Sequence, residues 1–447
     1  MLFNSPVFLL LFLPLSAALF FWEPLRRWRL PLVTVLSLLF YDISAGDKQL
    51  LILAVCIGWV HLLAVPGNGR RLALALALPV GVLLYFKYAG FLLGTVGLGD
   101  LVRPAKEGIP AGISFYVFHL ASFAIDRYRG DIPARPPLAA FASYVSFFPQ
   151  LIAGPITRFR QVGDNLRRLP GYRATGATLW GGVALFVVGL GAKVLLADPL
   201  DRVVAPLFAT VGELDRLQAL FAIFGYSFRI YFDFYGYSMM AMGLGLAFGV
   251  PLPRNFDQPY RSFSPKEFWR RWHMSLSFWI RDYLYLPLGG NRHHARNILI
   301  VFAVCGLWHG AGWNFIVWGL YHGLLVLLYG ATRPGWDRLP RPAGQALTFL
   351  LVSLGWPLFA LDLPSFVLLA QTVVLGGTTP TMPAVELAGW LLLAAAALAT
   401  FALDTDRLAS LDPAEPGYRW RQLALAAIAA VSLTLIEGSR PFIYFQF

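Results

Sequence analysis

The chain has 447 residues, of which 57% are hydrophobic and only 13% are charged, and its formal net charge is +12. Its mean hydropathy is +0.62. A soluble protein carries about a quarter charged residues, so this composition excludes an ordinary soluble domain and indicates a polytopic membrane protein. The expected surroundings are membrane lipid, and no nucleic-acid partner is expected.

Apolar segments recur along the whole chain and predict an all-α protein with about 12 membrane crossings. The seventh segment is overlong and contains glycines, which predicts a tilt or a break. The eighth is too short to cross alone and ends at His309. The predicted cores are 5–22, 30–44, 49–65, 72–95, 110–126, 178–197, 216–249, 298–308, 313–330, 346–361, 386–403 and 422–437.

Two other segments are not predicted to cross. Segment 141–157 contains Pro149 and Pro155 and is expected to be re-entrant. Segment 268–283 carries aromatic and aliphatic side chains at helical spacing, with arginines on other faces. This pattern predicts one amphipathic helix that lies at the membrane interface or dips into a funnel.

The basic residues predict the orientation in the membrane. No positive charge precedes the first apolar run, and Arg26, Arg27 and Arg29 follow it, so the first helix is expected to be retained with its start outside. Alternation then places the basic loops at 70–71, 127–135, 158–173 and 254–296 on the cytoplasmic side. Arg419 and Arg421 precede the last segment, so both termini are predicted to be extracytoplasmic.

The most informative residue is His309, which lies between two apolar runs in a stretch rich in glycine and tryptophan. An ionisable side chain at membrane depth is costly and is therefore a functional candidate. Glycines at 306, 310 and 312 predict a break between two helices, which protein or a water-filled cavity must cover. We expect His309 to be a catalytic base, with Trp308 and Asn314 beside it.

A second histidine, His273, borders the apolar face of segment 268–283. The simpler interpretation is an interfacial helix whose arginines hold lipid phosphates. The functional one is that His273 lines the same cavity as His309, and the local pattern does not decide between them.

Segment 216–249 contributes further polar groups. Arg229 and Asp233 are four residues apart, so they can neutralise each other on one helical face. Asp233 could instead orient a catalytic histidine as a hydrogen-bond acceptor. Tyr237 and Ser238 are expected to line the same cavity wall.

The last residues, 441–447, are strongly aromatic and contain Tyr444. The simpler interpretation is an aromatic anchor at the membrane interface. The alternative is that this tail folds back and that the Tyr444 hydroxyl handles an acyl group.

Other kinds of chemistry lack a sequence signature. The two cysteines lie in apolar segments, and the histidines do not have metal-ligand spacing, so neither a structural disulfide nor a metal site is expected. Acid–base catalysis by His309 and His273 remains. Acyl transfer needs such a base and an oxyanion donor, for which the Asn314 amide or a backbone N–H is a candidate.

With these residues in view, the chain resembles the membrane-bound O-acyltransferase family, in its alginate O-acetyltransferase branch. The resemblance runs nearly from end to end and is most specific at 233–291 and 308–319. The matching blocks are 1–9, 112–116, 148–156, 233–238, 255–256, 268–277, 281–291 and 308–311.

The resemblance implies roles for individual residues. His309 matches the invariant histidine of the family, taken as the catalytic base, and His273 matches a second histidine on the inner side of a tunnel. The tail around Tyr444 resembles an aromatic motif in which a tyrosine is proposed as an acyl relay. The implied fold is a ring of helices around a central tunnel, in a single membrane domain over 1–447. Its catalytic core would span about 110–330, and its last helix and tail 420–447.

The implied activity is O-acetylation of an exported polysaccharide, such as alginate, another exopolysaccharide or peptidoglycan. The acetyl group would come from a cytoplasmic thioester, acetyl-coenzyme A or an acyl carrier protein, and no bound cofactor is expected. A periplasmic or membrane-anchored partner O-acetyltransferase would finish the reaction. The implied location is the bacterial inner membrane.

Three alternatives remain open. Met239 follows the Gly-Tyr-Ser motif where the alginate-type pattern has Asp, which favours D-alanyl transfer to a cell-envelope polymer. A transporter of a polar envelope precursor would also explain buried His309 and Asp233, although no inverted repeat is visible. A scaffold for polysaccharide export would need no catalysis at His309.

Overall fold

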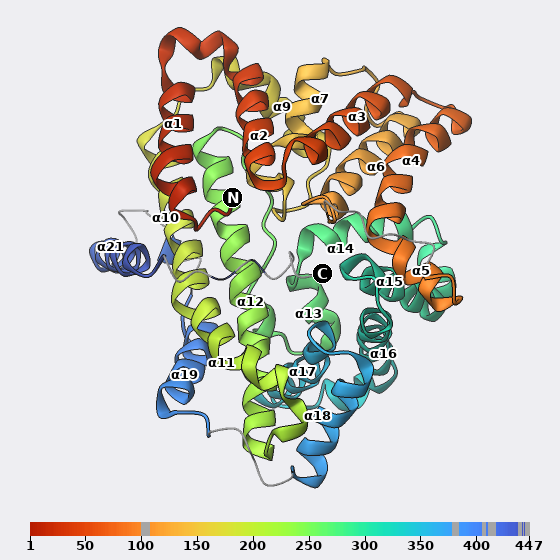
Figure 1. Cartoon of the computed structure of the whole chain (residues 1–447), viewed down its shortest axis with the longest axis vertical. Coiled ribbons are helices and arrows are strands. Elements are labelled where there is room, and N and C mark those ends of the chain that lie inside the picture. The colour runs from red at the N-terminus through yellow and green to blue at the C-terminus, as the bar shows by residue number, and fades with distance from the viewer. Residues whose placement is uncertain are drawn as a thin grey trace. The chain divides into compact units, whose positions relative to one another are not determined.

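The computed structural model describes residues 1–99, 108–377, 384–404, 408–409, 417–436, 440 and 442. Every regular element among these residues is helical, which confirms the all-α prediction (Figure 1). The chain divides into two compact units. Unit 1 comprises Met1–Gly189, Tyr237–Pro253 and Ala409–Ala427, and unit 2 comprises Leu190–Gly236, Arg254–Leu408 and Ile428–Phe447.

Unit 1 is built around an aromatic core. The rings of Phe3, Phe8, Phe12, Phe40 and Phe148 contact one another with centroid separations of 5.0 to 6.4 Å. Its helices are α1 (Leu13–Phe21), α2 (Arg29–Ala45), α3 (Asp47–Leu63), α4 (Gly69–Leu83), α5 (Ala89–Thr95), α6 (Ile113–Arg129), α7 (Leu138–Ser146), α8 (Phe148–Leu151), α9 (Phe159–Arg168) and most of α10 (Gly176–Gly191).

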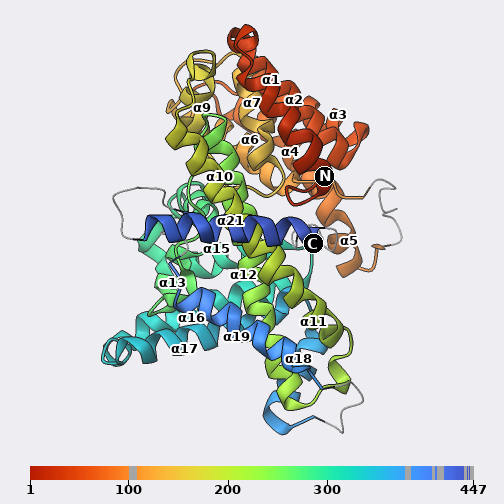
Figure 2. The ribbon, with the colours of Figure 1, turned by 90° about the vertical axis from the view of Figure 1, so that its left-hand side faces the viewer.

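Unit 2 holds α11 (Asp198–Ala209) and, up to Gly236, the long helix α12 (Arg216–Ala247). Helix α19 (Leu387–Phe401) packs against α11 (Figure 2). Its other helices are α13 (Pro265–Arg271), α14 (Met274–Ile280), α15 (His294–His309), α16 (Trp313–Trp336), α17 (Arg341–Gly355) and α18 (Leu363–Leu375). Helix α21 (Tyr418–Thr434) is shared between the two units.

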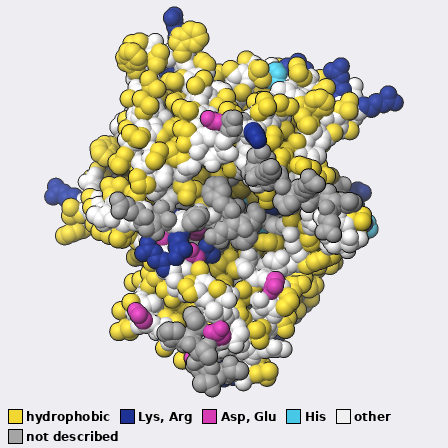
Figure 3. All heavy atoms as spheres, viewed as in Figure 1, with side chains coloured by type: hydrophobic (Ala, Val, Ile, Leu, Met, Phe, Trp, Pro, Cys, Tyr) yellow, Lys and Arg dark blue, Asp and Glu magenta, His cyan; other side chains and the backbone are white. Residues whose placement is uncertain are grey.

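Five helical segments among the described residues are long and apolar enough to cross a membrane. Many of their large side chains are exposed, and hydrophobic atoms cover much of the face in Figure 3. Leu10, Leu39, Leu62 and Leu74, for example, are all more than 40% exposed, as lipid-facing residues would be. The chain is therefore membrane-embedded, while the number of about 12 crossings and the central tunnel stay predictions.

Several element boundaries follow the sequence closely. Helix α15 ends at His309 and α16 begins at Trp313, as the glycine-rich stretch predicts. Helix α12 runs unbroken through the overlong seventh segment. Segment 141–157 forms α7, a break at Phe147 and the short α8, a bent path that suits a re-entrant segment.

The prediction of one helix over 268–283 is wrong. The helix breaks after Arg271 and restarts at Met274, with His273 between the two parts at φ 43°. The backbone N–H of Met274 donates to the carbonyl of Asn255 (2.9 Å). The carbonyl of Asn255 therefore accepts a hydrogen bond from an N–H that would bond within the helix if the helix were continuous.

Helices α15 and α16 pack closely against each other, with glycines at the contact (Figure 1). A Cβ on Gly306 would lie 2.0 Å from the carbonyl oxygen of Phe315, and a Cβ on Gly319 would lie 2.1 Å from that of Phe302. Small residues allow such close approach between membrane helices. The contact fixes the end of α15, and with it His309.

Candidate functional site

His309 is the last residue of α15 and is only 3% exposed. Aromatic rings surround its imidazole, with centroid separations of 4.8 Å to Trp308, 5.2 Å to Trp318 and 5.0 Å to Phe359. These rings exclude bulk water from the imidazole. Trp308, which directly precedes His309, is one of these contacts.

The turn after His309 is held from a third segment. The Asn314 amide donates to the carbonyl of Leu358 (2.9 Å), next to Phe359. Gly310 leaves room for the Phe315 ring, which a Cβ at that position would approach to 2.0 Å. Asn314 therefore joins the start of α16 to the segment that carries Phe359.

His273 adopts a left-handed backbone conformation, which is uncommon for a residue other than glycine. Such strain persists where the surroundings hold it and is concentrated at functional sites. Here the surroundings are supplied by Asn255, whose side-chain oxygen accepts from His273 Nδ1 (3.1 Å), the Ser275 hydroxyl (2.8 Å) and the Ser275 backbone N–H (3.3 Å).

These hydrogen bonds fix the tautomer of His273. A backbone N–H can only donate, so the Asn255 atom that it meets is the oxygen, and His273 Nδ1 must carry the proton. Nε2 is then the basic nitrogen, and it is buried without a hydrogen-bond partner among the described residues. Burial also lowers the pKa of the His273 imidazole, so the ring is neutral near pH 7.

The two histidines lie together, as the functional interpretation of His273 requires. Their ring centroids are 6.3 Å apart. The Phe234 ring of α12 packs nearly perpendicular to the His273 imidazole, with the ring centroids 4.6 Å apart. Two buried imidazoles at this separation can face one small reacting group, and a neutral one can take a proton from a hydroxyl.

A buried ionic cluster lies on the preceding helices of unit 2. Lys193 Nζ contacts Asp233 (2.8 Å) and Asp198 (2.7 Å), and the three side chains are at most 4% exposed. Arg229 contacts Asp201 (2.9 Å). Asp233 therefore pairs with Lys193, and Arg229 with a carboxylate of α11, whereas the pairing of Arg229 with Asp233 stays a prediction.

The remaining predicted residues have other surroundings. Tyr237 and Ser238 belong to unit 1, where the Tyr237 ring stacks on Phe3 at 4.6 Å and Ser238 is buried. Tyr444 lies outside the described residues, but Phe442 is described and buried. Its ring lies 5.9 Å from Phe234, the residue that contacts His273.

Sequence reasoning missed two features of this site. Asn255 belongs to the matching block 255–256, but no role was predicted for it, because its contacts with His273 span 18 residues. His322 could have been found, since it is an ionisable residue in an apolar run, as His309 is. It is fully buried, and its ring lies 5.0 Å from Trp318 and 5.2 Å from Trp269.

Comparison with known proteins identifies the family of this chain. The model of the MBOAT, membrane-bound O-acyltransferase, family matches residues 12–343. The chain is 40% identical over 382 residues to a probable alginate O-acetylase, AlgI, of Azotobacter vinelandii, covering 80% of this chain and 75% of that protein. It is 33% identical over 409 residues to a peptidoglycan O-acetyltransferase of Helicobacter pylori, covering 80% and 77%.

A third relative is more distant. The teichoic acid D-alanyltransferase of Bacillus subtilis is 30% identical over 229 residues, covering 49% of this chain and 58% of that protein. The family match extends over both histidines and the long α12 helix. This chain belongs to the membrane-bound O-acyltransferase family and is a membrane-embedded acyltransferase.

Proposed function

We propose that this protein is an inner-membrane O-acetyltransferase that passes an acetyl group from a cytoplasmic thioester to an exported polysaccharide. The observation that carries the proposal is the pair of buried imidazoles of His273 and His309, 6.3 Å apart within aromatic walls. The two most extensive similarities described above, to an alginate O-acetylase and a peptidoglycan O-acetyltransferase, support acetyl as the group and an envelope glycan as the acceptor class.

His309 is the proposed general base. Its imidazole takes the proton of the attacking hydroxyl while the hydroxyl oxygen bonds to the thioester carbonyl carbon. The carbon–sulfur bond then breaks, and the protonated imidazole gives its proton to the leaving sulfur, which departs as the thiol. The aromatic walls exclude water that would otherwise hydrolyse the thioester. His273, whose ring lies 6.3 Å from that of His309 and whose Nε2 is the basic nitrogen, is proposed to accept a hydrogen bond from the thiol.

A cavity in unit 2 suits the acyl donor. It has a volume of about 210 Å³ and an almost wholly apolar lining that includes Ile298, Phe302 and Cys305 of α15. Cys305 is one helical turn before His309. Arg281 and Tyr285 line the other side, in the basic region that is predicted to be cytoplasmic. We propose that the acyl-thioester arm occupies this cavity.

The tail is the proposed exit route of the acetyl group. Arg440 approaches Asp201 (3.8 Å), and Phe442 packs on Phe234 beside His273. Two residues of extended chain span at most about 7 Å, so we propose that Tyr444, two residues after Phe442, is the residue that reaches the histidines. Its hydroxyl would take the acetyl group from the thioester as a phenyl ester. A separate partner transferase would then move the group to the polysaccharide and regenerate the hydroxyl.

The test is a deletion strain complemented by wild type, His309→Ala or Tyr444→Phe, with membrane levels matched. His293→Ala serves as the control, because His293 lies exposed at the end of a short 3₁₀ helix. Alkali-labile acetate on the exported glycans should fall at least about 100-fold in His309→Ala, the scale of general-base catalysis, and stay unchanged in the control. Tyr444→Phe should also lose acetate if the tail is the relay.

The competing functions give other results in the same strains. D-alanine esters that disappear in place of acetate would establish D-alanyl transfer, which the B. subtilis relative favours. Unchanged acetate in the deletion itself would contradict the acetyltransferase. Export that fails on deletion but survives His309→Ala would instead indicate a scaffold, and substrate crossing liposomes with this protein alone would indicate a transporter.

A further inference from the structure

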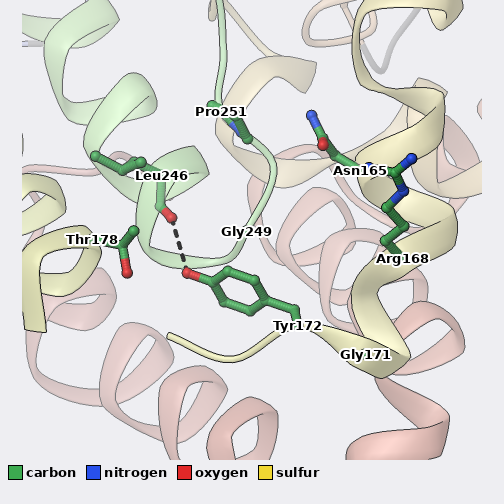
Figure 4. Close-up of a pocket in the computed structure, with 8 residues that line it drawn as sticks. All are labelled: Asn165, Arg168, Gly171, Tyr172, Thr178, Leu246, Gly249 and Pro251. Atoms are coloured by element: carbon green, nitrogen blue, oxygen red, sulfur yellow. Dashed lines mark hydrogen bonds between the residues drawn. The ribbon is translucent and has the colours of Figure 1, made fainter. Parts of the chain in front are cut away.

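A large cavity lies in unit 1, outside the unit that carries His273 and His309. Its volume is about 590 Å³, within the usual range for ligand pockets. Helix α9, the following turn, the start of α10 and the end of α12 supply its walls (Figure 4). The lining residues are Asn165, Arg168, Gly171, Tyr172, Thr178, Leu246, Gly249 and Pro251.

This cavity has polar side chains on one wall and apolar side chains on another. Asn165 and Arg168 project from one side of α9, and neither side chain has a hydrogen-bond or ionic partner among the described residues (Figure 4). The opposite wall is apolar and contains Leu246 and Pro251. A cavity with a guanidinium and an amide on one side and hydrocarbon on the other suits an amphiphile with an anionic head.

The Tyr172 ring forms the floor between these walls. Its hydroxyl donates to the carbonyls of Leu246 (3.4 Å) and Ala247 (3.2 Å). Gly249 has φ +78°, and a Cβ there would lie 2.8 Å from the tyrosine ring. The ring is therefore fixed by α12 and its glycine, and the cavity is built rather than left by loose packing.

Two membrane-spanning segments begin beside this cavity. One is Gly176–Ala209, whose first turn supplies Thr178 to the lining. The other is Glu23–Ala45, from which Arg26 donates to the carbonyl of Pro170 (2.9 Å) and Arg29 to that of Tyr172 (2.5 Å). Because both spans start here, the cavity lies at the level of the lipid headgroups.

The surrounding side chains have the composition of a membrane interface. Trp22, Trp28 and Trp180 are 57%, 54% and 66% exposed and flank the starts of these two spans. Exposed tryptophans mark the headgroup level of membrane proteins. Arg27 and Arg173 add positive charge to a region whose acidic groups, Glu23 and Asp164, contact Arg29 and Arg167.

We propose that this cavity binds the phosphate of an anionic phospholipid. The Arg168 fork and the Asn165 amide donate to the phosphate oxygens, as guanidinium groups do in phosphate recognition. The N-terminus of α10, whose first turn contains Thr178, adds favourable dipole charge. The apolar wall takes the glycerol and upper acyl carbons. This site is independent of the acyl-transfer chemistry proposed above.

The experiment uses the full-length protein, purified in detergent and titrated with phosphatidylglycerol or phosphatidylcholine, with bound lipid counted by native mass spectrometry. Arg168→Gln removes the guanidinium from an exposed position, so folding should be unaffected. Arg167→Gln is the control, since Arg167 carries the same charge on the same helix, pairs with Asp164 and does not line the cavity.

One phosphatidylglycerol should bind with an affinity that Arg168→Gln weakens by about tenfold or more, the scale of hydrogen bonds to charged groups. Arg168→Lys should weaken it less, and Arg167→Gln should leave it near wild type. Equal binding of phosphatidylcholine, or an equal loss in Arg167→Gln, would overturn the proposal. Displacement of the lipid by coenzyme A in an Arg168-dependent way would reassign the site to a soluble phosphate.

Discussion

At the scale of single residues, one side-chain oxygen controls His273. Asn255 Oδ1 accepts from His273 Nδ1 and from both donors of Ser275, which leaves Nε2 as the basic nitrogen. The tautomer of a histidine is set by the hydrogen bond on its other nitrogen. Asn255 therefore acts on the reaction through His273, as a positioning residue.

Asn255→Asp should shift the acidic limb of the pH–activity profile to higher pH. Burial lowers the pKa of His273, and a carboxylate at position 255 would raise it. The protonated His273 ring cannot accept the hydrogen bond from the thiol, so activity is lost below a pKa that now lies higher. Ester formation by membrane vesicles between about pH 5 and 8 measures the shift, in the range where histidine titrates.

The control for this variant is Ser275→Ala. It removes the hydrogen bond from the Ser275 hydroxyl to the same oxygen and keeps the one from the Ser275 backbone N–H. It adds no charge, so its profile should keep the wild-type midpoint. An unchanged midpoint in Asn255→Asp would show that His273 does not titrate in the reaction.

Lys193 neutralises two buried carboxylates, those of Asp198 and Asp233. Lys193→Met should lower the free energy of unfolding by about 3–5 kcal/mol, the cost of leaving a buried charge without its partner. Thermal unfolding in detergent measures it. Arg333→Met is the control, because its pair with Asp337 is exposed and should contribute nothing measurable.

Combining Lys193→Met with Asp198→Asn and Asp233→Asn should recover part of the lost stability, because no uncompensated charge then stays buried. A single Lys193→Met variant as stable as wild type would contradict the assignment of these three groups as an ionic cluster.

At the scale of elements, local pattern predicted the breaks that glycine makes and missed those made by distant contacts. The turn between α15 and α16 follows from Gly310 and Gly312, which are visible in the sequence. The break at His273 depends on Asn255, which lies far away along the chain and has no periodic signal. Likewise, helical spacing suggested Arg229 for Asp233, whereas Lys193 comes from another helix.

The contact between α15 and α16 predicts opposite effects of one substitution at two glycines. Gly306→Ala should destabilise the protein by about 1–3 kcal/mol, because its Cβ would lie 2.0 Å from the carbonyl oxygen of Phe315. Gly330→Ala on α16 meets no atom within 4 Å and should stabilise by about 0.5–1 kcal/mol. Unfolding midpoints measured in detergent should fall for Gly306→Ala and rise for Gly330→Ala.

Activity should follow the same contact. Gly306 is one turn before His309, so Gly306→Ala should also reduce ester formation, whereas Gly330→Ala should not. Equal midpoints for the two variants would contradict the close packing of these helices.

At the scale of the whole molecule, composition was sufficient to predict a helical membrane protein, whereas the orientation predicted from the basic residues stays a prediction. The two compact units could not be predicted, because helices α10, α12 and α21 each extend across their division without a change in sequence character. The reaction proposed here depends on the orientation, since the thioester is cytoplasmic and the glycan is outside.

Cysteine labelling tests that orientation directly. Cys56 and Cys305 are buried, so an introduced cysteine at an exposed position can be labelled over a low background. Lys48→Cys lies at the start of α3, on the side predicted to be outside, and Arg173→Cys and Arg292→Cys lie in segments predicted to be inside. A membrane-impermeant maleimide should label the first in intact spheroplasts and the other two only after permeabilisation. The reverse pattern would place the tail on the donor side, where Tyr444 could not deliver acetyl to an exported glycan.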